Sequence, residues 1–160
     1  MKRLTLLLLS LLFLFVGCSD SVPGENTLSA YDFTMQNQDG AITRLSNFLD
    51  KPVVLNFWAS WCSPCKAEMI DFDRMYMVYG KQVNFVMVSV DDSIDEMREF
   101  METYGYSFPV YYDVNGEGSS LYGISSIPQT FFINKDGKVV LSYEQRITLS
   151  QLERGINIIK

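Results

Sequence analysis

Two cysteines three positions apart are the residues of this sequence best suited to chemistry. Cys62 and Cys65 lie within Trp61-Cys62-Ser63-Pro64-Cys65, after an apolar run and before a segment with helical features. A cysteine at a helix N-terminus meets unpaired N–H groups and the positive end of the helix dipole, which lower a thiol pKa from ~8.5 to ~3.5–7.5. We therefore expect the Cys62 thiolate to attack a target disulfide and Cys65 to resolve the mixed disulfide.

A pair of cysteines with this spacing has two less reactive interpretations. A zinc site needs four ligands, commonly histidines or a second cysteine pair. The sequence has three cysteines and no histidine, so we expect no metal. A purely structural disulfide would close a very short loop and add little stability, which leaves it as the weaker alternative. The lack of histidine also excludes Ser-His and Cys-His catalysis.

Composition places the chain among globular proteins of one domain. The 160 residues are 48% hydrophobic and 20% charged, which suffices for a core without disulfide staples. The net charge of −6 argues against a nucleic-acid partner, because phosphate binding needs a basic surface. We expect a monomer that works without a cofactor.

The first residues have the pattern of an export signal. Lys2 and Arg3 precede an almost unbroken apolar run, Leu4–Val16. A membrane-spanning helix needs ~20 apolar residues, so the run suits the core of a signal peptide, with an uncleaved anchor helix as the alternative. We predict a lipoprotein-type signal peptide over residues 1–17.

The end of this leader carries the third cysteine. Phe15-Val16-Gly17-Cys18 resembles the lipobox of bacterial lipoproteins, although Phe15 stands where Leu is usual. The resemblance implies that Cys18 is the lipid attachment site and takes no part in redox chemistry. Residues 18–30 then form a flexible tether, and residues 31–160 form the folded domain.

The cysteine pair must be held between a strand and a helix. Val53–Trp58 is apolar except for Asn56 and predicts a buried strand, and Val83–Val90 predicts a second one. The segment between them predicts a helix over Ser63–Tyr79 that ends at Gly80. Strands joined through a helix are expected to be parallel neighbours. The apolar side of the helix is expected to comprise Ala67, Ile70, Met75, Met77 and Val78.

The pattern of the remaining segments predicts an alternation of strands and helices, which is typical of an α/β or α+β domain. Turn signals at Asp39-Gly40 and Asp136-Gly137 predict two hairpins. Patterning and capping-box spacing predict the following segments: a hairpin over Tyr31–Leu45, a helical turn at Ser46–Leu49, a helix over Ile94–Tyr104, a short strand at Pro109–Tyr112, a loop and short helix over Asn115–Tyr122, a hairpin over Gln129–Asn134 and Lys138–Tyr143, and a last helix from Thr148 to about Ile159.

Two motifs resemble those of the thioredoxin-fold superfamily, and specifically its TlpA/ResA-like extracytoplasmic branch. Residues 53–66 resemble the active-site stretch of that family, and Ser126–Phe132 resembles its cis-proline loop. The resemblance covers residues 31–160. It implies an α/β domain with a thioredoxin-like fold: a central mixed β-sheet flanked by helices, with an N-terminal β-hairpin and a βα insertion.

The resemblance also implies a substrate-binding surface next to the cysteines. A trans bond is the default for any proline, but the family likeness implies that Pro128 is cis and faces Cys62. The residues expected to contact substrate are Trp61, Ser63, Pro64, Ile127 and Pro128.

A glutamate is the expected partner of the second cysteine. Cytoplasmic thioredoxins carry a buried Asp at the position of Asn56, whereas the resembled branch commonly has Asn there and a Glu at the position of Glu68. By helix geometry Cys65 and Glu68 share a face, so Glu68 is the candidate proton acceptor or pKa modulator for Cys65. A solvated surface Glu is the alternative. The family usually has Pro where this chain has Ile70, so its helix kink is in doubt.

Asp91-Asp92 follows a predicted strand and could be taken for a metal site. Without a further ligand motif, we interpret the pair as helix capping.

The function expected from these features is disulfide reduction outside the cytoplasm. The resemblance implies substrates among exported proteins, such as apocytochrome c or a methionine sulfoxide reductase, and a membrane electron donor of the CcdA/DsbD type. It places the domain on the outer face of the cell membrane, held by its lipid anchor. The alternatives are a disulfide-forming oxidase, a thiol peroxidase and a non-catalytic binding protein with the same fold.

Overall fold

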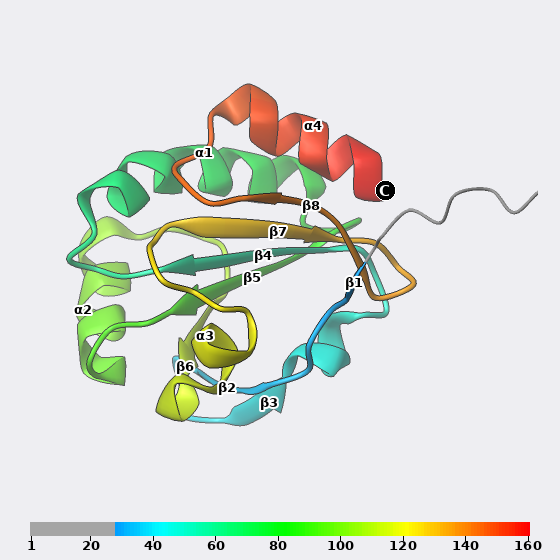
Figure 1. The fold of residues 1–160 in the computed structure, drawn as a ribbon. Helices are drawn as coiled ribbons and strands as arrows, with labels where there is room; N and C mark the ends of the chain where they lie inside the picture. Colours follow the sequence, from blue (N-terminus) through cyan, green and yellow to red (C-terminus); the bar gives the residue numbers. More distant parts are fainter. Residues whose placement is uncertain (1–27) are drawn as a thin grey trace, which may run out of the picture.

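The strands of the chain form one mixed sheet in the order β1-β8-β7-β4-β5-β6-β2-β3 (Figure 1). The computed structural model describes residues 28–160. The strands are β1 (Leu28–Ser29), β2 (Thr34–Asn37), β3 (Ile42–Arg44), β4 (Val53–Trp58), β5 (Asn84–Ser89), β6 (Val110–Asp113), β7 (Gln129–Ile133) and β8 (Lys138–Tyr143). Parallel pairing joins β4 to β5 and β5 to β6, and the other pairs are antiparallel. The prediction of a central mixed sheet is confirmed.

Helices cover both faces of this sheet. They are α1 (Ser63–Tyr79), α2 (Ile94–Tyr104), α3 (Glu117–Leu121) and α4 (Leu149–Ile159), with short 3-10 helices η1 (Leu45–Phe48) and η2 (Val114–Gly116). Figure 1 shows α1 and α4 side by side on one face, and α3 beside β6 and β2 on the other. The predicted order of elements is confirmed from β2 onward, and the predicted bounds of the α1 and α2 helices agree with those observed.

The central strand β4 sends alternate side chains into two cores. Val54 and Trp58 pack with residues of α1, α2 and α4, whereas Val53, Leu55 and Phe57 pack in a second cluster on the opposite face. Successive side chains of a strand point to opposite faces, so this division follows from the strand geometry. The same alternation places Asn56 on the side covered by α1.

The buried side of α1 differs from the predicted one. The residues buried there are Cys65, Glu68, Met69 and Phe72, which recur with helical spacing. Ala67 is exposed, and Ile70, Met77 and Val78 have exposed fractions of 51%, 68% and 60%. The prediction of an apolar side through these residues was wrong for all but the half-buried Met75. It counted hydrophobicity alone, whereas the shared face predicted for Cys65 and Glu68 is the buried one.

The folded region begins earlier than expected. Leu28 and Ser29 pair with Val139 and Lys138 of β8, so the predicted tether over residues 18–30 runs into the sheet. The predicted signal peptide and Cys18 lie outside the described residues. No helix of residues 28–160 is long and apolar enough to cross a bilayer.

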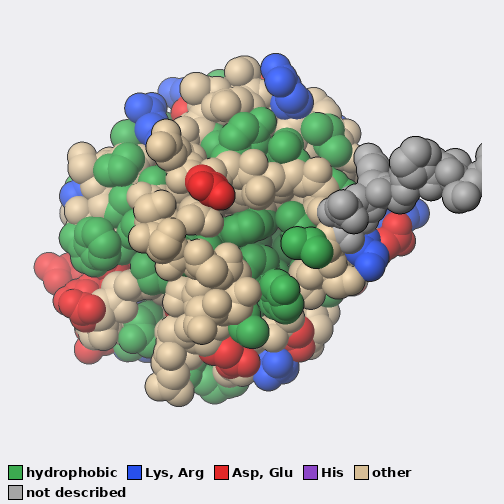
Figure 2. Space-filling view, in the orientation of Figure 1, with side chains coloured by type: hydrophobic (Ala, Val, Ile, Leu, Met, Phe, Trp, Pro, Cys, Tyr) green, Lys and Arg blue, Asp and Glu red, His purple; other side chains and the backbone are tan. Residues whose placement is uncertain are grey.

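The surface seen from the side of β7, β8 and α3 carries little positive charge at its centre. Figure 2 shows hydrophobic side chains in the middle of this face, with Lys and Arg side chains standing apart near its edges. A protein partner with apolar groups fits such a surface better than a polyanion does.

Candidate active site

A disulfide joins Cys62 and Cys65 at the N-terminus of α1. Cys62 is the N-cap residue of this helix, and the backbone N–H of Cys65 donates to Cys62 Sγ over 3.2 Å. Cys62 is 4% exposed and Cys65 is fully buried, so substrate can approach Cys62 first. In the reduced protein, the same N–H group and the helix dipole would favour a thiolate at Cys62.

The loop before β7 brings the second motif to this disulfide. Because β7 is antiparallel to β4, its first residues lie next to the last residues of β4, where the cysteine motif begins. The Ile127–Pro128 peptide bond is cis, and the Ile127 carbonyl oxygen lies 3.9 Å from Cys62 Sγ. Two motifs that are distant in the sequence thus form one site.

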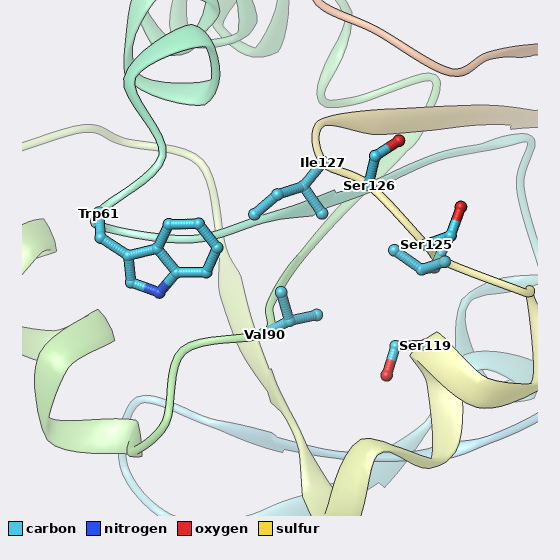
Figure 3. Close-up of a pocket in the computed structure, with 7 residues that line it drawn as sticks. Trp61, Val90, Ser119, Ser125, Ser126 and Ile127 are labelled. Atoms are coloured by element: carbon cyan, nitrogen blue, oxygen red, sulfur yellow. The ribbon is translucent and has the colours of Figure 1, made fainter.

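A pocket of about 410 Å³ opens beside this loop. Figure 3 shows the Trp61 indole extending toward Ile127 on one side of it, with Val90 beneath and serines on the opposite side. Trp61 is 63% exposed, as expected for a residue at the rim of the site. The pocket is suited to an apolar side chain of a substrate, with hydroxyl groups available to its backbone.

A second pocket of about 330 Å³ lies on the other side of the loop. Its lining combines Pro64 and Pro128 with Glu144, Gln145 and Arg146, which follow β8. The structure therefore brings four of the predicted substrate-binding residues, Trp61, Pro64, Ile127 and Pro128, to two adjoining pockets. Ser63 is exposed beside them in the first turn of α1 and lines neither pocket.

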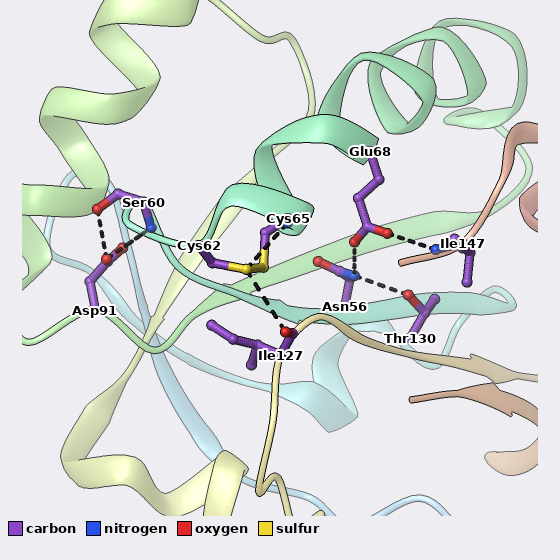
Figure 4. The surroundings of a disulfide bond; sticks show 9 residues. All are labelled: Asn56, Ser60, Cys62, Cys65, Glu68, Asp91, Ile127, Thr130 and Ile147. Carbon is purple, nitrogen blue, oxygen red and sulfur yellow. Dashed lines mark hydrogen bonds between the residues drawn. A yellow bond between two sulfur atoms is a disulfide. The ribbon is translucent and has the colours of Figure 1, made fainter. Parts of the chain in front are cut away.

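Glu68 lies buried one turn after Cys65 on the inner side of α1. Its two carboxylate oxygens accept hydrogen bonds from Asn56 Nδ2 (3.1 Å) and from the Ile147 backbone N–H (3.0 Å) (Figure 4). Burial raises the pKa of Glu68 from 4.5 to about 7, and these two hydrogen bonds oppose the rise. The alternative of a solvated glutamate was wrong, and the carboxyl group is suited to take or give a proton near neutrality.

Asn56 connects this carboxyl group to the sheet. Besides Glu68, its Nδ2 donates to Thr130 Oγ1 over 3.0 Å. The resemblance drew attention to Asn56 and Glu68. It did not indicate Thr130 or Ile147, although Thr130 could have been found as a polar residue in an apolar strand directly after the proline loop.

Asp91 does not cap α2, so our helix-capping interpretation was wrong for this residue. Ser93 is the N-cap of α2, while Asp91 is 4% exposed and bonds to Ser60 and Ser89. Asp92 contributes to the start of the helix only through its backbone N–H, which donates to Glu96. Among residues 28–160 no group of three or more His, Cys, Asp or Glu could hold a metal ion.

Comparisons with known proteins agree on one family. The model of the AhpC/TSA family matches residues 27–142. The thiol-disulfide oxidoreductase ResA of Oceanobacillus iheyensis is 40% identical over 120 residues, which are 74% of this chain and 62% of that protein.

Two solved structures resemble the fold. A DsbE-type thiol:disulfide interchange protein from Chlorobium tepidum has a TM-score of 0.77 at 29% identity, over 84% of this chain and 97% of that one. The exposed lipoprotein thioredoxin Etrx1 of Streptococcus pneumoniae has a TM-score of 0.71 at 29% identity, over 80% of this chain and 99% of that one.

Proposed function

The chain belongs to the AhpC/TSA family, and from this premise we propose that it is a ResA-like thiol–disulfide oxidoreductase that reduces disulfides of exported proteins. The observation that carries the proposal is the Cys62–Cys65 disulfide at the start of α1, with the Ile127 carbonyl oxygen 3.9 Å from Cys62 Sγ. A nucleophilic sulfur, a resolving sulfur and an edge of backbone for a substrate segment thus meet at one place.

The reaction is a transfer of two electrons. In the reduced protein the Cys62 thiolate attacks one sulfur of a substrate disulfide, and the other substrate sulfur leaves as a thiolate that takes up a proton. Cys65 then loses its proton, with Glu68 as the proposed acceptor, and attacks Cys62 Sγ. The second substrate sulfur leaves, and the Cys62–Cys65 disulfide re-forms.

The test is the reduction of insulin disulfides by the protein with dithiothreitol as electron source. We expect turnover by the wild-type chain and none by Cys62→Ser. Cys65→Ser is expected to accumulate a mixed disulfide through Cys62, and mass spectrometry of this adduct from cells would identify the natural substrate. A wild-type protein that carries a reducible disulfide and still gives no turnover would instead support a non-catalytic binding protein.

The same variants distinguish a thiol peroxidase from a disulfide reductase. Consumption of hydrogen peroxide that depends on Cys62, at rates above those of insulin reduction, would overturn the reductase proposal. Oxidation of reduced substrate peptides faster than reduction of oxidised ones would instead favour a disulfide-forming oxidase.

We also propose that the domain is held outside the cell membrane by a lipid on Cys18 and is recharged by a membrane donor of the CcdA/DsbD type. The support is the apolar run before Cys18 and the similarity to a protein described as an exposed lipoprotein. Labelling with a radioactive fatty acid is expected to mark the wild-type chain and not Cys18→Ser. Label on both would contradict the assignment of Cys18.

A further inference from the structure

The loop that delivers Cys62 is tied to a buried carboxylate that the redox mechanism does not use. Asp91 follows β5, and both of its oxygens accept hydrogen bonds from Ser60. The Ser60 backbone N–H donates to Oδ1 (2.9 Å) and Oδ2 (3.1 Å), and the Ser60 hydroxyl donates to Oδ1 (2.8 Å). Figure 4 shows these bonds two residues before Cys62.

The carboxylate is held by hydrogen bonds rather than by a cation. The Ser89 hydroxyl donates to Asp91 Oδ2 over 2.6 Å, and the described ion pairs do not include Asp91. A buried charge without a counter-ion costs more free energy than a neutral amide in the same place. An Asn side chain would also offer an oxygen acceptor to Ser60, so hydrogen bonding alone does not explain an acid at this position.

The hydrogen bonds between Asp91 and Ser60 hold the turn that forms the site. Within residues 59–62 the Cys62 backbone N–H donates to the Ala59 carbonyl oxygen over 3.1 Å, and Ser60 lies inside this turn. The residue after β5 is tied to the same segment, because the Val90 N–H donates to the Trp58 carbonyl oxygen over 2.8 Å. Asp91 therefore fixes the turn that sets Trp61 at the pocket rim and Cys62 at the helix N-terminus.

We propose that Asp91 is a positioning residue of the redox site, which holds the turn over residues 59–62 and whose negative charge makes the Cys62–Cys65 pair more reducing. The charge opposes the helix dipole at Cys62 and so disfavours the thiolate of the reduced protein. A dithiol whose reduced form is less stable is a stronger reductant, and stabilisation of the reduced form makes a strong oxidant. This inference rests on the thiol–disulfide exchange proposed above.

Other charges lie around the disulfide and must be held constant in any test. They are Lys66, Glu96 and Glu99, which share a hollow with Ser60, Glu144 and Arg146 in the pocket at Pro64, and Glu68 behind Cys65. None of these side chains is hydrogen-bonded to residues 59–62 in the described part of the chain. Asp91 alone couples its charge to the turn by direct bonds.

The sequence offers a matched control on the same helix as the cysteines. Asp73 Oδ1 of α1 accepts from the backbone N–H (2.7 Å) and the hydroxyl (2.6 Å) of Ser107, which resembles the bonding of Asp91 to Ser60, although it involves one oxygen and an exposed site. At 1.5 Å of rise per residue, Asp73 lies roughly 16 Å along the helix from Cys62, beyond the ~10 Å screening length at 0.1 M salt. Asp73→Asn therefore removes a hydrogen-bonded carboxylate charge of this kind from a place where its field does not reach the sulfur.

The experiment equilibrates the full chain with reduced and oxidised glutathione. Two glutathione thiols supply two electrons and two protons, which convert the Cys62–Cys65 disulfide into two thiols and leave one glutathione disulfide. We expect Asp91→Asn to raise the equilibrium constant for reduction of the protein by about threefold to tenfold. Cys62 of this variant should also be alkylated by iodoacetamide at lower pH, whereas Asp73→Asn should move neither quantity.

A second variant should shift the equilibrium constant for reduction in the opposite direction. Ser89→Ala removes the 2.6 Å hydrogen bond to Asp91 Oδ2 and leaves the charge less compensated, so the equilibrium constant should fall. Ser89→Ala also tests the proposed role of the Asp91 charge if Asp91→Asn does not fold. Unchanged equilibrium constants and alkylation profiles in both Asp91→Asn and Ser89→Ala, even with lower Tm values, would overturn the proposal. A wild-type protein that does not exchange with glutathione would overturn the proposed function itself.

Discussion

Two buried carboxyl groups flank the disulfide on opposite sides in Figure 4, and their surroundings differ. Glu68, behind Cys65, receives one hydrogen bond at each oxygen, from an amide side chain and a backbone N–H. Asp91, beside the turn that leads to Cys62, receives bonds from two hydroxyls and a backbone N–H. The comparison indicates a division of roles, in which Glu68 is the proton acceptor proposed for Cys65 and Asp91 holds the turn before Cys62 in place.

The largest expected effect concerns the pH dependence of folding. Burial raises the pKa of Glu68 from 4.5 to about 7, so the folded state holds a proton that the unfolded state has lost between these values. Stability must then decrease as pH rises through this window, by about 3 kcal/mol in total. Urea unfolding of the oxidised protein at pH 4 to 8 measures this slope. In Glu68→Gln the slope should flatten, and an equal slope in both proteins would assign the effect to another group.

The next effect concerns the rate of turnover. Glu68→Gln retains the size of the side chain but cannot accept the proton of Cys65, so insulin reduction at pH 7 should be about 100-fold slower. Single-turnover measurements should place the loss in the release of the mixed disulfide rather than in its formation. If formation slows instead, Glu68 acts on Cys62 and the division of roles is wrong.

Removal of the Asp91 carboxylate should lower the stability of the protein more than it lowers the rate of insulin reduction. Asp91→Ala leaves the N–H of Ser60 without an acceptor in a partly buried place, which should lower the free energy of unfolding by about 2 kcal/mol. Chemical denaturation checks this value. Insulin reduction should change only by a small factor, and a loss as large as that of Glu68→Gln would contradict the division of roles.

The smallest effect tests the link between Glu68 and the sheet. Thr130→Val keeps the shape of the side chain and removes one acceptor of Asn56 Nδ2, at a cost of about 1 kcal/mol of folding free energy. Thermal unfolding checks the cost. The pH slope assigned to Glu68 should persist in this variant, because the bonds from Asn56 and Ile147 to the carboxyl group remain. Loss of that slope would show that Thr130 controls the Glu68 environment.

The sequence predicted those parts of the site that depend on short-range pattern. The strand over Val53–Trp58, the helix over Ser63–Tyr79 and the place of Cys62 between them follow from local hydrophobicity and helix-end signals, and all three are confirmed. The cis-proline loop rested on resemblance, because it lies far from Cys62 in the chain, and the role of Glu68 rested on resemblance together with the helical spacing from Cys65. The structure places both beside the disulfide.

What the sequence did not reveal depends on contacts between distant segments. The inner side of α1 was misplaced because Glu68 is polar and the exposed residues Ile70, Met77 and Val78 are apolar. The two-residue strand β1 exists through pairing with β8, and Asp91 acquires its role through Ser60, 31 positions earlier. Such features become visible only when the sheet brings the segments together.

The central claim is that Cys62 is the ionised nucleophile of the pair. The most direct measurement is the rate of iodoacetamide alkylation of the reduced protein as a function of pH, with the modified cysteine mapped by mass spectrometry and Cys62→Ser as the control. The account predicts that Cys62 reacts first, with a midpoint below the ~8.5 of a free cysteine, while buried Cys65 reacts slowly. A Cys62 that stays protonated beyond pH 9, or a faster reaction at Cys65, would contradict it.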